Sequence, residues 1–167
     1  MKIRTYRIIL IIFILLTVGF ILFNSTRTGE QSANMSQGIS ESIAQIVVPD
    51  FDKLQEPTKS ETVRKVHVSV RNIAHALEFA CLGFFVTLLL ATFKFNYGRY
   101  LMPALLTFLS CFSVAVCDEF LQGIIAERAS EISDVFMDTL GIFASIVCAI
   151  IVDYTVRAII VRNKKRG

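Results

Sequence analysis

The sequence predicts an all-α polytopic membrane protein with four transmembrane helices. The chain of 167 residues is 54% hydrophobic and contains no Trp and three Pro, and its mean hydropathy is +0.60. This composition is too apolar for an ordinary small soluble domain. A transmembrane helix needs about 20 mostly apolar residues to cross the hydrocarbon layer. Four runs approach or reach that length: residues 8–23, 73–93, 100–117 and 135–156.

The first run, residues 8–23, has the basic start and apolar centre that a signal peptide also has. Its apolar part is long, however, and no small-x-small cleavage site follows it directly. We therefore interpret it as an uncleaved first span. Cleavage would leave three spans and would not move the others.

A long polar connection, residues 24–72, follows the first span. Because few loops of this length lack structure of their own, we expect local structure in it. Residues 36–47 begin with Ser, which can cap a helix, and are followed by Pro49. Their apolar residues recur at helical intervals: Ile39, Ile43, Ile46 and Val47. This stripe would lie on the outer membrane surface or cover the helix ends, and we favour a cover over polar residues.

The remaining connections are shorter. Residues 94–99 join the second and third spans, and residues 118–134 join the third and fourth. We find no internal repeat and no separate soluble segment, so residues 1–167 are interpreted as one membrane domain.

The charge distribution predicts that both termini are cytoplasmic. Cationic loops are retained on the inner side of a membrane. With four spans and an inner amino terminus, the inner side holds a single acid, Asp153, and many basic residues: Lys2, Arg4, Arg7, Lys94, Arg99, Arg157, Arg162, Lys164, Lys165 and Arg166. The basic tail is too short for a groove-binding element, so we expect it to contact anionic lipid and not nucleic acid.

Polar residues interrupt the apolar runs at the predicted outer side. Arg71, His75 and Glu78 are spaced by four and three residues, so they share one helix face. Topology brings further polar residues to the same leaflet, at the end of the third span, in the connection and at the start of the fourth: Asp118, Glu119, Gln122, Arg128, Asp134 and Asp138. A charge in hydrocarbon costs on the order of 3 kcal/mol, so several of these carboxylates are expected to turn inward, to pair or to contact water.

Several chemistries fit these residue types. Glu119 can act as a general base beside Asp118, and His75 and Glu78 are further catalytic candidates. We expect ligand contacts from the remaining polar residues: Arg71, Gln122, Arg128, Asp134 and Asp138. Carboxylates with one imidazole would also suit a divalent metal ion, although the chain has no HExxH motif. The alternative is a purely structural cluster, since acids at the start of the fourth span oppose its helix dipole.

The motifs "HALEFACLGFF", "DEFLQ" and an Arg followed by "SDVFMDTLG" resemble the VanZ-like family of bacterial membrane proteins over nearly the whole chain. The family often has Tyr at the position of Phe79. The resemblance implies location in a bacterial cell membrane and a contribution to resistance against teicoplanin and related lipoglycopeptides. It places the polar residues above at the family's characteristic positions, without supplying a reaction.

Together these observations predict an outward-facing acidic pocket that binds or acts on a component of the cell envelope. Its partner would be a membrane lipid, a lipid-linked cell-wall precursor or the lipid tail of an antibiotic. Two other classes stay open: a metal-assisted membrane hydrolase or transferase with a lipid substrate, and a structural or regulatory partner of envelope-synthesis proteins.

Overall fold

The computed structural model describes residues 2–27, 29–125 and 132–165. Its elements are α1 (Ile3–Ser25), α2 (Gly29–Val47), the short 3-10 helix η1 (Phe51–Lys53), α3 (Thr58–Leu90), α4 (Leu101–Ile124) and α5 (Ile132–Lys164). No strand occurs among these residues. Four helices, α1, α3, α4 and α5, are long and apolar enough to cross a membrane. The predicted all-α class is confirmed, and these four helices correspond to the four predicted spans by length and composition, while the side on which the termini lie stays a prediction.

The helices extend beyond the predicted spans. α3 begins at Thr58, directly after Pro57, and α4 continues to Ile124. Asp118, Glu119 and Gln122 therefore lie inside α4 and not in a connection. The apolar runs predict only the part of each helix that suits the hydrocarbon layer. The helices are longer because polar residues can continue the same hydrogen-bonded backbone.

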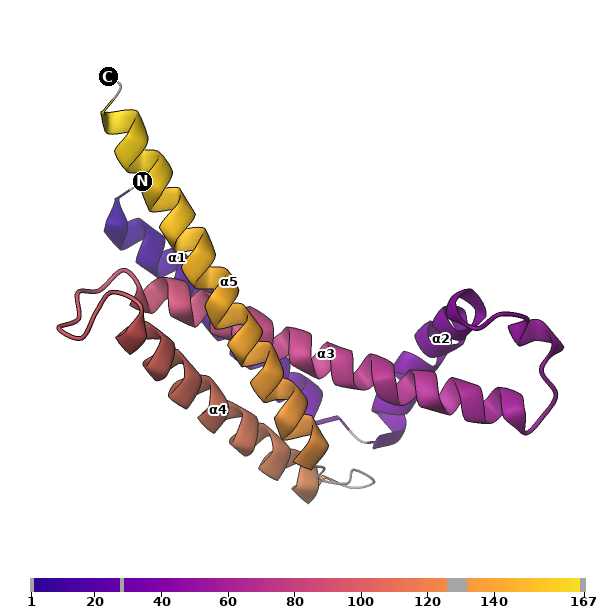
Figure 1. Ribbon diagram of the computed structural model, residues 1–167. Coiled ribbons are helices and arrows are strands. Elements are labelled where there is room, and N and C mark those ends of the chain that lie inside the picture. Colours follow the sequence, from indigo (N-terminus) through magenta and orange to yellow (C-terminus); the bar gives the residue numbers. More distant parts are fainter. Residues whose placement is uncertain (1, 28, 126–131, 166–167) are drawn as a thin grey trace.

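The bundle consists of α1, the carboxyl-terminal part of α3, α4 and α5, while α2 lies beside the amino-terminal part of α3 (Figure 1). α3 and α5 form the most extensive helix pair. The start of α1, the end of α3 and the end of α5 lie toward one end of the bundle. The end of α1 and the start of α5 lie toward the opposite end. With four spans in succession, the first helix starts and the last helix ends at the same end of the bundle.

A small apolar core fills the centre of the bundle, and most large apolar side chains point outward. The core contains Ile21, Phe79, Leu82, Cys111, Ala115, Ile142 and Ile146. By contrast, Leu15 and Leu16 of α1 are 66% and 64% exposed. Such a surface is costly in water but suits contact with lipid tails. The pattern of exposure agrees with helices that lie in a bilayer.

Two glycines allow α3 and α5 to approach each other closely. A Cβ atom at Gly141 would lie 2.9 Å from the carbonyl carbon of Ala76, and one at Gly83 would collide with the side chain of Ser145. Small residues let helix backbones approach where lipid supplies no hydrophobic driving force. Because Ala76 follows His75 directly in α3, this contact also sets how far His75 lies from α5.

Arginines from the first and last helices hold the carboxyl end of α3. Arg7 donates to the Thr92 hydroxyl and carbonyl at 2.8 and 2.9 Å, and Arg157 donates to the Ala91 carbonyl at 3.2 Å. Carbonyl groups at a helix end have no partner within the helix and carry the negative end of its dipole. These contacts tie α1, α3 and α5 together at one end of the bundle.

The helix predicted within the polar connection is present as α2, which packs against α3. It buries Ser40 and Ala44 and leaves Ile39, Ile46 and Val47 exposed. Its place beside the amino-terminal part of α3 differs from the expected cover over the helix ends (Figure 1). The buried side is the narrow small-residue face, because small side chains permit close packing against α3.

Candidate functional site

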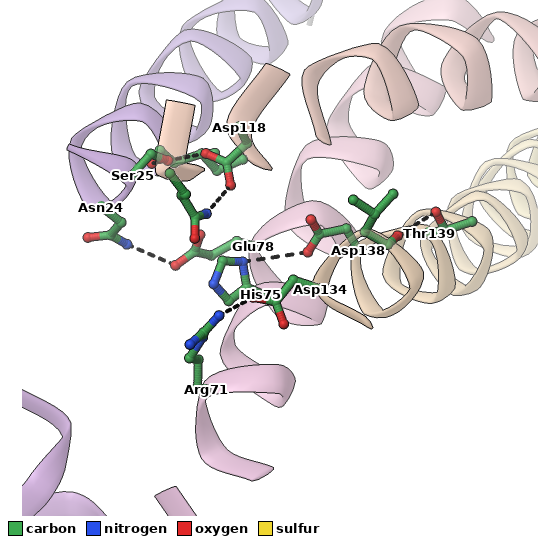
Figure 2. A network of polar contacts seen from close by, with 12 residues as sticks. Asn24, Ser25, Arg71, His75, Glu78, Asp118, Asp134, Asp138 and Thr139 are labelled. Carbon is green, nitrogen blue, oxygen red and sulfur yellow. Dashed lines mark hydrogen bonds and ion pairs between the residues drawn. The ribbon is translucent and has the colours of Figure 1, made fainter. Parts of the chain in front are cut away.

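Polar side chains from four helices meet at the end of the bundle where α1 ends and α5 begins (Figure 2). We call these ten residues the polar cluster. They are Asn24 and Ser25 of α1, Arg71, His75 and Glu78 of α3, Asp118, Glu119 and Gln122 of α4, and Asp134 and Asp138 of α5. On α3 and α5, spacings of three and four residues place the members on one helix face, whereas Asn24 and Ser25, like Asp118 and Glu119, are adjacent in sequence.

Two contacts connect α3 and α5 across the cluster. Arg71 forms an ion pair with Asp134, whose side chain is 1% exposed. One turn further along both helices, His75 Nδ1 lies 3.6 Å from Asp138 Oδ1. Figure 2 shows the two pairs side by side. The spacing of four residues on each helix thus places a basic side chain of α3 beside an acid of α5 twice.

The end of α1 supplies hydrogen bonds to the acids of α3 and α4. Asn24 Nδ2 donates to Glu78 Oε1 at 2.8 Å, and the Ser25 hydroxyl donates to Asp118 Oδ1. Gln122 Nε2 donates to the other oxygen of Asp118 at 2.7 Å. Asp118 lies near the carboxyl end of α4, where the helix dipole disfavours a negative charge. The hydrogen bonds from Ser25 and Gln122 partly offset this unfavourable interaction with the helix dipole.

The cluster is buried and rich in acid. Asp118, Asp134 and Asp138 are at most 2% exposed, and Glu119 is 7% exposed. Within the polar cluster, Arg71 is the one permanently charged cation, and five members are carboxylates. Asp138 is within electrostatic reach of the four others: Glu78, Asp118, Glu119 and Asp134. Uncompensated charge of this kind is costly away from water, so the cluster favours a cation, protons or a ligand that carries positive charge.

Some buried oxygens of the cluster lack a hydrogen-bond donor among the described residues. They are Oε1 of Gln122, Oδ1 of Asp134 and Oδ1 of Asp138. Buried polar atoms are nearly always satisfied in native structures. These three acceptors are therefore positions where a bound species would gain contacts.

The structure brings together all but one of the predicted site residues. Arg128 lies outside the described residues. Sequence reasoning missed Asn24 and Ser25, although two polar residues at the very end of an apolar run were a usable signal. A cavity of about 530 Å³ lies elsewhere, between α2 and the first turns of α3, and none of its lining residues belongs to the cluster. The outward-facing pocket stays a prediction.

The fold and this site define a class: a polytopic helical membrane protein with a buried, acid-rich polar cluster at one end of its bundle. Residues 10–153 match the family model described as VanZ/LLP1. The chain therefore belongs to the VanZ/LLP1 family, as its motifs indicated. Comparison with the curated proteins and with the solved structures gave no match.

Proposed function

We propose that this protein binds a phosphate-bearing component of the bacterial cell envelope, such as a lipid-linked cell-wall precursor, at the outer leaflet. Through that binding it contributes to resistance against teicoplanin and related lipoglycopeptides. The proposal combines the family membership with the chemistry of the polar cluster.

The observation that carries the proposal is the state of Arg71. One of its terminal nitrogens is held by Asp134, while the side chain is 30% exposed. Its Nε is buried and has no acceptor among the residues that the structure describes, so a ligand would reach the exposed part of the side chain. An arginine that is fixed in place and partly exposed is suited to a phosphate or carboxylate group. Arg71 would bind the anionic group, and the nearby acids would bind the accompanying cation or proton.

We assign roles to three further cluster residues from their positions. Gln122, whose Oε1 has no donor among the described residues, would orient the ligand. Asp118 and Glu119 would hold a cation or proton. Orientation of the cluster toward the outer leaflet rests on the charge distribution of the sequence.

Lipid that copurifies with the protein tests the binding role. Arg71→Gln should reduce retention of phosphate-bearing lipid about tenfold in native mass spectra, because a charge-assisted hydrogen bond contributes about 1.5 kcal/mol or more. The matched control is Arg64→Gln, which removes the same charge from an exposed position two turns earlier on α3. Equal retention by both variants and the unchanged chain would refute the role of Arg71.

Resistance is tested separately in a susceptible bacterium. The double variant Asp118→Asn and Glu119→Gln should abolish any increase in teicoplanin tolerance at equal protein levels in the membrane. Asp52→Asn, which alters an exposed acid in η1, should leave it unchanged. Turnover of the bound lipid in these preparations would instead favour the hydrolase or transferase class.

A further inference from the structure

Three buried side chains of the polar cluster present ligand atoms to one point. Ligand atoms of His75, Asp118 and Asp138 all lie within 4.8 Å of one another, and all three residues are buried. They come from α3, α4 and α5, so the tertiary fold alone assembles them. Acidic residues gather for many reasons, and two further observations distinguish this group.

The first observation is the distance between His75 and Asp138. Their nearest atoms, Nδ1 and Oδ1, are 3.6 Å apart. An N–H to oxygen hydrogen bond measures about 2.7–3.2 Å. Two ligands of one tetrahedral ion, each about 2.1 Å from it, are roughly 3.4 Å apart. The pair is therefore too far apart for a good hydrogen bond and close to the separation of two ligands that share an ion.

The second observation is the unsatisfied oxygen of Asp138. The side chain is 1% exposed and points into the cluster (Figure 2). Its Oδ1 has no hydrogen-bond donor among residues 2–27, 29–125 and 132–165. A buried carboxylate oxygen in this state carries a large desolvation cost unless a proton or a cation neutralises it. A metal ion at this point would remove that cost.

The surroundings of Asp118 resemble the outer hydrogen bonds of a metal site. Its two oxygens accept hydrogen bonds from Ser25 and Gln122. Each carboxylate oxygen has two lone pairs, so one direction on each oxygen stays open for a metal. Hydrogen bonds of this kind fix the orientation of metal ligands and tune their affinity. The Ser25 hydroxyl is itself held near the Ile21 carbonyl at 2.7 Å.

We propose that His75, Asp118 and Asp138 form a binding site for one divalent transition-metal ion, of the Zn²⁺ or Mn²⁺ type. One imidazole and two carboxylates form a mixed nitrogen and oxygen set that suits such ions. Separations of up to 4.8 Å exceed the roughly 3.4 Å between two ligands of a tetrahedral ion, so the side chains would move closer together when the ion binds. Three protein ligands leave at least one coordination position for water or for an oxygen of a bound ligand. The ion does not depend on the proposed lipid ligand, since the protein atoms alone define its position.

Metal analysis of the full chain in detergent tests the proposal. Protein purified without chelator should contain about one transition-metal ion per chain, measured by elemental mass spectrometry. Chelation should remove the ion, and titration with Co²⁺ should restore a visible absorption band that reports nitrogen and oxygen ligands. A chain that neither retains metal nor binds Co²⁺ after stripping would overturn the proposal.

Variants locate the ion. His75→Ala and Asp138→Asn should weaken Co²⁺ binding at least tenfold, and Ser25→Ala, which keeps every ligand, should weaken it about tenfold through Asp118. Asp52→Asn makes the same chemical change at an exposed acid and should bind as the unchanged chain does. Circular dichroism and gel filtration identify any variant that fails to fold, and Ser25→Ala is the decisive variant in that case. Equal Co²⁺ affinity in all folded variants would place the ion elsewhere and refute this site.

The outcomes separate the two proposals. Metal binding without lipid retention would support the ion and refute the lipid ligand. Lipid retention by a chain that binds no metal would refute the ion and leave the lipid proposal supported.

Discussion

Asp153 shows at the scale of one residue how an acid is kept within an apolar helix. It accepts hydrogen bonds from Arg157 Nε at 2.6 Å and from the Tyr100 hydroxyl at 3.1 Å, and Arg99 lies 4.0 Å away. Every charge here has a partner of opposite sign. The polar cluster at the other end of the bundle differs, since its acids outnumber Arg71. This contrast is the reason why we assign a stabilising role to Asp153 and propose a binding role for the cluster.

Replacement of Asp153 tests the stabilising role. Asp153→Asn should lower the free energy of unfolding by about 1 kcal/mol, a modest loss because Arg157 is 40% exposed. The loss should largely disappear when Arg157→Gln is present, because the interaction is then already absent. Thermal unfolding of the two single variants and the double variant in detergent measures this coupling. Strictly additive losses would show that the pair is not the source of the effect.

At the scale of elements, the contact between α3 and α5 controls the geometry of the site. Gly141 lies against the backbone of Ala76, next to His75, and it follows Asp138 by less than one turn. The distance between His75 and Asp138 thus depends on Gly141, which has no functional side chain.

Gly141→Ala should therefore disturb both stability and the site. Its Cβ would meet backbone atoms that cannot rotate away, so overpacking should cost about 1–3 kcal/mol and lower Tm by about 2–12 °C. The control is Gly19→Ala in α1, where a Cβ atom meets nothing within 4 Å and helix propensity improves. Its Tm should stay equal or rise. An unchanged Tm for Gly141→Ala would mean that the helices separate at little cost.

The exposed apolar face of α2 gives a second test at this scale. Ile39 and Ile46 point away from α3, and Ile46 is 84% exposed. An amphipathic helix with such a face is suited to the membrane surface. The chain has no Trp, so Ile46→Trp introduces a single Trp. Brominated lipids should quench the fluorescence emission of this Trp. Glu41→Trp, on the opposite face of α2, should be quenched much less. Equal quenching at both positions would argue against a membrane contact for this face.

In the whole molecule, the start of α1, the end of α5 and the connection between α3 and α4 lie toward the same end of the bundle (Figure 1). The polar cluster lies at the other end. An orientation with basic residues inside would expose the cluster side to the outer leaflet. The proposed function requires that orientation.

Reporter fusions measure the orientation of the protein in the membrane. A fusion after Tyr97, which is 71% exposed in the connection between α3 and α4, should report a cytoplasmic location. A fusion after Lys53 in η1 should report the outer side, because α3 lies between the two fusion points and crosses the membrane once. A reversal of the two signals would place the cluster toward the cytoplasm and refute binding at the outer leaflet.

The fold class and the approximate spans follow from the amino-acid sequence alone. Long apolar runs admit few arrangements other than membrane helices, because every backbone polar group must be satisfied inside the hydrocarbon layer. The sequence also identified most of the cluster. His75 and Glu78, and likewise Asp134 and Asp138, share a helix face through local spacing alone.

Which groups meet across helices depends on how the helices pack in three dimensions. The pairs of Arg71 with Asp134 and of His75 with Asp138 depend on the close approach that Gly141 permits. The contacts of Asn24 and Ser25 depend on where α1 ends beside α3 and α4. Helical periodicity fixes neighbours within one helix, whereas helix register and separation follow from packing over the whole bundle. The candidate metal site depends on this packing, because its three residues come from three different helices.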